Sequence, residues 1–124
     1  MVRASRFGKL HRTVASLLVT TVDTQALLGL VLYGVFSPLT RAAMNNWGAA
    51  MKDPSSRFWA VEHIASMLAA LVLIHIGHVR IKRASKDGLK HRRAVLFFGL
   101  AIGLMLMATP WPCSVHSRPW IRGL

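Results

Sequence analysis

Acidic residues and cysteine are scarce in this sequence of 124 residues. Four Asp and Glu stand against sixteen Lys and Arg, which gives a formal net charge of +12. The single cysteine, Cys113, excludes an internal disulfide framework and cannot supply a thiolate metal cluster. The sequence also has no Gly-rich phosphate loop, no ordered Ser, His and Asp set and no H-E-x-x-H pair. We therefore predict no catalytic residues and no metal site, and favour a protein that is not an enzyme.

Hydrophobic residues are abundant instead, at 53% of the chain. They gather into three runs that are bounded by basic residues or proline. About 20 apolar residues, rising about 1.5 Å each, cross a bilayer as a helix. We predict an all-α integral membrane protein with a single domain over residues 1–124 and three transmembrane helices over residues 13–36, 58–79 and 94–109.

The segment between the first two runs is more polar, yet it has one apolar face. Ala43, Met44, Trp47, Ala50 and Met51 recur at helical spacing. This pattern is typical of a short helix that lies in the membrane interface. We predict such a helix over residues 40–51.

The basic residues flank the apolar runs, and their distribution predicts the orientation of the chain. Eleven Lys and Arg lie in residues 1–12 and 80–93, whereas residues 37–57 and 110–124 hold five. Because cytoplasmic loops carry the excess of Lys and Arg, we expect a bacterial inner-membrane protein with its N-terminus inside and its C-terminus outside. Positive charge in these places also suits contact with anionic lipid headgroups and does not indicate nucleic-acid binding.

Two polar side chains interrupt the first predicted helix. Asp23 lies about ten residues in, near the bilayer midplane, where an unpaired carboxylate costs a few kcal/mol. It is expected to be protonated or paired, either as a proton or quinone-hydroxyl site or as a hydrogen bond that joins two helices. Gln25 is two residues farther, about 200° around the helix, so the two side chains cannot face one neighbour. We expect protein on two sides of this helix.

The second run carries histidines that are candidate cofactor ligands. His63 and His78 share one helical stripe, and His75 lies farther round the helix. A bis-histidine haem site needs a second histidine on a facing helix, and the third run offers Met105 at the matching depth instead. One alternative is therefore a haem between His63 and Met105. The other is a hydrogen bond from a histidine to a neighbouring helix or to Glu62.

The third run contains Gly99 and Gly103, four residues apart. Small residues at this spacing allow close approach of another membrane helix. Together with the two-sided polarity around Asp23 and Gln25, this pair favours a small subunit that packs against other membrane proteins in a larger complex.

Several blocks of the sequence resemble a family of small bacterial integral membrane proteins that are labelled cytochrome b-like. The resemblance covers residues 6–112 and is carried by residues 25–33, 37–38, 51–54, 57–63 with Met67, 90–93 and 110–112. The Phe-Trp-Ala-Val-Glu-His and Pro-Trp-Pro blocks are its most specific parts. The family's label implies a membrane helix bundle with haem b as its cofactor.

Two departures from the family pattern bear on that cofactor. Many members resemble a four-helix bundle whose additional N-terminal helix bears a histidine at the depth of His63, and we expect this chain to lack that helix. Many also have histidine where this chain has Asp23. We therefore expect no cofactor on the isolated chain, and interpret it as a subunit of a respiratory or photosynthetic electron-transfer complex. The alternative is a haem- or quinone-reactive electron carrier centred on His63.

Overall fold

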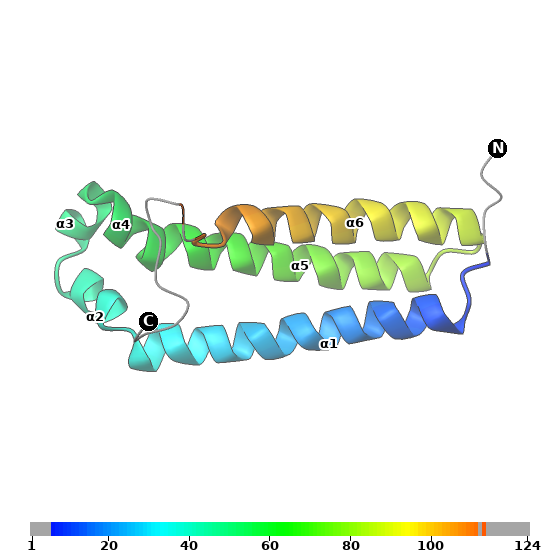
Figure 1. Ribbon diagram of the computed structural model, residues 1–124, viewed down its shortest axis with the longest axis horizontal. Helices are drawn as coiled ribbons and strands as arrows, with labels where there is room; N and C mark the ends of the chain where they lie inside the picture. The colour runs from blue at the N-terminus through cyan, green and yellow to red at the C-terminus, as the bar shows by residue number, and fades with distance from the viewer. Residues whose placement is uncertain (1–5, 112, 114–124) are drawn as a thin grey trace.

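The computed structural model describes residues 6–111 and residue 113, and every regular element in that part of the chain is helical. Figure 1 shows three long helices lying side by side, with short helices at one end of the bundle. The elements in chain order are α1 (Lys9–Val31) with its π-helical continuation η1 (Leu32–Phe36), α2 (Pro38–Asn45), α3 (Trp47–Lys52), α4 (Pro54–Arg57), η2 (Phe58–Glu62), α5 (His63–Lys82) and α6 (Asp87–Ala108).

Three continuous helical stretches are long and apolar enough to cross a bilayer: Lys9–Phe36, Pro54–Lys82 and Asp87–Ala108. For the described residues, this confirms the prediction of an all-helical protein with three helices of bilayer-crossing length and composition. The helices extend beyond the predicted bounds, however, and α6 begins at Asp87 rather than at residue 94. The prediction followed apolarity, which marks the part of a helix that lipid can surround, whereas charged residues continue a helix into water without interrupting its backbone hydrogen bonds.

The helix predicted over residues 40–51 is not continuous, because α2 and α3 are separate helices divided at Asn46. The Asn46 side chain accepts a hydrogen bond from the backbone N–H of Ala49 at 3.2 Å. Ser37 caps α2 and Asp53 caps α4 in the same way, each followed by proline at the first helical position. The chain therefore restarts its helix three times in this segment.

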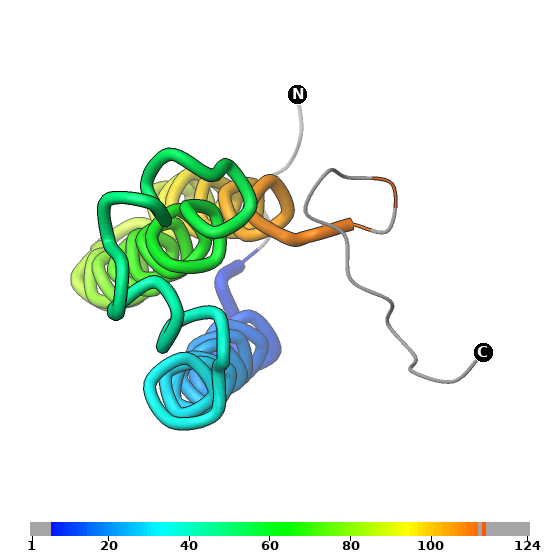
Figure 2. The backbone as a smooth tube through the Cα atoms, turned by 90° about the vertical axis from the view of Figure 1, so that its left-hand side faces the viewer, coloured from blue at the N-terminus to red at the C-terminus, as the bar shows by residue number. Residues whose placement is uncertain are grey.

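The central helix is α5, which lies between α1 and α6 when the bundle is viewed end-on (Figure 2). α6 packs along α5, whereas α1 makes a smaller contact with α5. The core between the helices is built on Ala70, Ile74 and Ala101, which are fully buried. Small side chains at two of these three positions let the helix backbones approach closely.

α5 and α6 approach each other closely at Gly77. A Cβ atom at this position would lie 2.4 Å from Cβ of Phe97. Gly99 and Gly103 behave differently, because a Cβ at either one would meet nothing within 4 Å among the described residues. That Gly99 and Gly103 allow close approach of another helix stays a prediction, and it refers to a helix of another chain.

Candidate functional site

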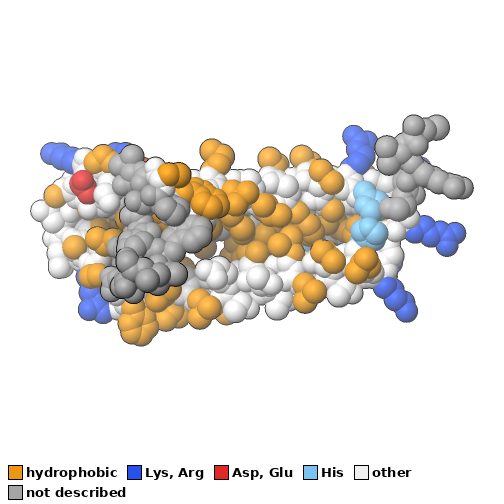
Figure 3. Space-filling view, in the orientation of Figure 1, with side chains coloured by type: hydrophobic (Ala, Val, Ile, Leu, Met, Phe, Trp, Pro, Cys, Tyr) orange, Lys and Arg blue, Asp and Glu red, His pale blue; other side chains and the backbone are white. Residues whose placement is uncertain are grey.

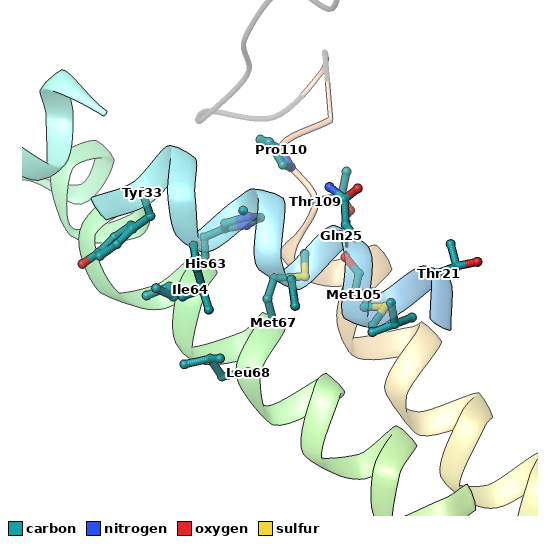
Figure 4. Close-up of a pocket in the computed structure, with 14 residues that line it drawn as sticks. Thr21, Gln25, Tyr33, His63, Ile64, Met67, Leu68, Met105, Thr109 and Pro110 are labelled. Atoms are coloured by element: carbon teal, nitrogen blue, oxygen red, sulfur yellow. Dashed lines mark hydrogen bonds between the residues drawn. The ribbon is translucent and has the colours of Figure 1, made fainter. Parts of the chain in front are cut away.

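A cavity of about 530 Å³ lies between α1, α5 and α6, toward the end of the bundle that the short helices cover. In the space-filling view the molecule is hollowed between α1 and α6, and the floor of this hollow is hydrophobic (Figure 3). The polar and sulfur-bearing side chains that line the cavity include Thr21, Gln25, Tyr33, His63, Met67, Met105 and Thr109 (Figure 4).

His63 is oriented by a hydrogen bond to the end of α6. Its Nδ1 lies 2.8 Å from the carbonyl oxygen of Ala108. A carbonyl can only accept, so Nδ1 carries the proton and donates, which leaves Nε2 of the neutral ring as an acceptor. Ala108 is the last residue of α6, where the carbonyl has no partner within the helix. His63 therefore caps one helix from another, and the rings of Phe58 and Trp59 lie beside it at 5.7 and 5.5 Å.

Two further side chains donate hydrogen bonds to carbonyls in the last turn of α6. Thr109 Oγ1 donates to the carbonyl of Met105 at 2.7 Å, and Trp111 Nε1 donates to the carbonyl of Leu106 at 2.8 Å. Carbonyls in the last turn of a helix need such partners, and the carbonyl of Leu106 also accepts from the backbone N–H of Thr109 at 3.4 Å. The Pro-Trp-Pro block of the sequence thus follows a closely capped helix end that forms one wall of the cavity.

The alternative of a histidine hydrogen bond named two partners, a neighbouring helix or Glu62, and Glu62 is paired with Arg57 instead. Oε1 of Glu62 accepts a hydrogen bond from Nε of Arg57 at 2.7 Å, which makes an ion pair within one helical stretch. Arg57 is near and positively charged, so it competes better for a carboxylate than a neutral imidazole does. The histidine finds its partner on the neighbouring helix instead.

The cavity brings the two candidate haem ligands into one lining but offers no charged side chain to haem propionates. His63 and Met105 both line it, as their predicted depths required. None of the described residues that line the cavity is charged, so two haem propionates would lack a cationic partner there. The described residues also contain no group of three or more His, Cys, Asp or Glu that could hold a metal ion.

Gln25 faces the cavity, and its side-chain amide makes no hydrogen bond to any other described residue. Asp23, two residues earlier, is not among the lining residues and faces α5 instead. The predicted angle of about 200° between the two side chains places them in these different surroundings. Gln25 therefore brings two donors and one acceptor to the cavity without an internal partner.

Asp23 is paired with His75. Nε2 of His75 lies 2.7 Å from Oδ1 of Asp23, and this contact joins α5 to α1. Tyr33 makes a second tie between the same two helical stretches, because its hydroxyl donates to the carbonyl of Ala60 at 2.7 Å. The sequence predicted that Asp23 is protonated or paired and left open a histidine hydrogen bond to a neighbouring helix, but it did not join Asp23 to His75. The sequence does contain a signal for this pair, because a carboxylate and an imidazole each lie within an apolar helix, where a polar side chain needs a partner.

Comparison of the chain with protein-family models, curated proteins and solved structures finds no match. The resemblance to cytochrome b-like membrane proteins stays a prediction.

Proposed function

We propose that this protein is a small integral membrane subunit that packs against the helices of a larger electron-transfer complex in the bacterial inner membrane. Large apolar side chains at its surface support the placement in a membrane, since Leu27, Val95 and Met107 are 66%, 76% and 86% exposed. Lipid or a neighbouring helix would cover them. The start of α1 and the turn from α5 to α6 lie at the same end of the bundle, which supports a cytoplasmic location for both basic segments (Figure 1).

The observation that carries the proposal is the amide of Gln25 in the hollow between α1 and α6. A polar group without a partner is unfavourable in the hydrocarbon of a bilayer, and a helix from another subunit would supply one. Gly99 and Gly103 support this packing, because the space around both is open and α6 could approach a further helix there.

Replacing Gln25 with leucine is expected to release the chain from its complex, because the change removes the hydrogen bonds that another helix would make. Native gel electrophoresis of detergent-solubilised membranes measures the release. Thr24→Leu is the matched control, since Thr24 Oγ1 donates to the carbonyl of Thr20 within its own helix at 2.9 Å. The control should stay in the complex. A wild-type chain that migrates alone, with the same mobility as Gln25→Leu, would contradict the proposed function.

The orientation of His63 favours a second candidate function, a quinone-reactive electron carrier. Nε2 of His63 can accept a hydrogen bond from a quinol hydroxyl, while the amide of Gln25 can donate to a quinone carbonyl. The hydrophobic hollow between α1 and α6 would receive an isoprenoid tail from the lipid. A quinone would occupy the same cavity. It needs no charged side chain in the lining, whereas the propionates of a haem need cationic partners.

Changing His63 to glutamine is expected to leave the fold intact at a loss of about 1–2 kcal/mol, because the glutamine amide can still donate to the carbonyl of Ala108. Thermal unfolding in mild detergent measures this loss. We also expect no Soret band in the purified wild-type chain, as read from a reduced-minus-oxidised spectrum. A stoichiometric b-type spectrum in the wild type that disappears in His63→Gln would show that haem binds after all.

A further inference from the structure

A second hollow, of about 270 Å³, lies at the opposite end of the bundle from the cavity. Basic side chains reach it from each of the three long helices: Arg12 from α1, Lys82 from α5 and Lys90 from α6. These residues are far apart in the sequence, and only the packing of the helices brings them together. Ser16 and His78 add a hydroxyl and an imidazole to the same lining.

The charge of this hollow is unbalanced. The described residues that line it include no carboxylate, and neither Arg12 nor Lys82 makes an ion pair with a described residue. Lys90 has a distant contact, with its Nζ 3.5 Å from Oδ1 of Asp87. Like charges around one small space repel one another, and an anion among them removes that repulsion. His78 also has a buried Nδ1 with no hydrogen-bond partner in the described part of the chain.

The remaining lining is apolar and well packed. Phe7, Ala15 and Ile81 are 7%, 6% and 4% exposed. The ring of Phe7 also packs on those of His11 and His91, with centroids 5.2 and 5.1 Å away, which holds the start of the described chain against α6. One small hollow therefore combines cations with a fixed hydrophobic wall. A phospholipid presents the matching pair of features, an anionic phosphate next to a hydrocarbon chain.

We propose that this hollow binds the phosphate of an anionic phospholipid headgroup. The inference rests on the proposed membrane location, in which this end of the three helices lies at the cytoplasmic surface. The guanidinium of Arg12 and the ammonium groups of Lys82 and Lys90 donate to the phosphate oxygens, and the hydrophobic wall contacts the glycerol and the first part of an acyl chain. Free phosphate shares the anionic chemistry but would leave the apolar wall unused.

Native mass spectrometry of the full chain in detergent, with phosphatidylglycerol or phosphatidylcholine added, tests the site. We expect one phosphatidylglycerol per chain and at least tenfold weaker binding of phosphatidylcholine. Each basic residue near a phosphate contributes about fivefold to binding, so Arg12→Gln with Lys82→Gln should weaken phosphatidylglycerol binding about 25-fold. The matched control, Arg83→Gln with Lys86→Gln, removes equal charge outside the hollow and should change binding by less than about twofold.

Three results would overturn the headgroup site: equal losses in the two double variants, equal binding of the two lipids, or binding of inorganic phosphate in place of phosphatidylglycerol. The comparison of the two lipids uses only wild-type protein, so it does not depend on the folding of a variant. Carbonate washing of membranes tests the location separately. Release of the chain by the wash contradicts the proposed function, whereas retention without a lipid preference contradicts only this site.

Discussion

Asp23→Leu is expected to weaken the contact of α1 with α5 and to destabilise the fold by about 3 kcal/mol, at the lower end of the range for breaking an ion pair that is shielded from water. The variant leaves His75 without the partner that lies 2.7 Å from its Nε2. The two side chains are 42% and 49% exposed, and in a bilayer that exposed part faces lipid rather than water. Unfolding of the purified protein by increasing sodium dodecyl sulfate, followed by circular dichroism, measures the effect.

Asp23→Asn separates the contribution of the hydrogen bond from that of the charge. Asparagine has a similar volume and retains a donor and an acceptor, so we expect a loss of about 1 kcal/mol. The double variant Asp23→Leu with His75→Leu removes both polar groups and should recover much of the stability that Asp23→Leu loses. If the leucine and asparagine variants both fold and assemble normally while the host complex loses activity, Asp23 is a proton site rather than a tie between helices.

Gly77→Ala is expected to destabilise the packing of α5 against α6 by about 1–3 kcal/mol. The added methyl group would lie 2.4 Å from Cβ of Phe97, and because both atoms are fixed by their backbones, the helices must move apart. The greater helix propensity of alanine offsets at most about 1 kcal/mol of this loss. Thermal unfolding in detergent, followed by circular dichroism, measures the net effect.

Gly99→Ala is the matched control for this variant, because it makes the same chemical change on a helix where a Cβ meets nothing within 4 Å. In the isolated chain it should be neutral or stabilising, by up to about 1 kcal/mol from helix propensity. A Gly77→Ala protein as stable as the wild type would show that α5 and α6 are farther apart than the structure has them.

The three long helices could be predicted from sequence because the signal for them is local. Three apolar runs bounded by charge or proline are sufficient to identify helices of bilayer-crossing length, whatever their neighbours. Helix ends were harder to predict. Residues 87–93 are polar but helical, and a cap at Asn46 divides α2 from α3. Apolarity reports the surroundings of a helix, whereas its ends depend on hydrogen bonds to individual caps.

The sequence by itself predicted that Asp23 is protonated or paired and that His63 and Met105 lie at matching depths. Only the tertiary structure decided that the partner of Asp23 is His75, that His63 donates to Ala108 and that Gly77 faces Phe97 at a close contact between α5 and α6. The physical reason lies in α5 and α6, which are apolar around most of their circumference. A helix of this kind carries no amphipathic pattern to show which face meets a neighbour. Its rotation and axial position follow from interlocking with side chains on the other helices, and no single segment contains that information.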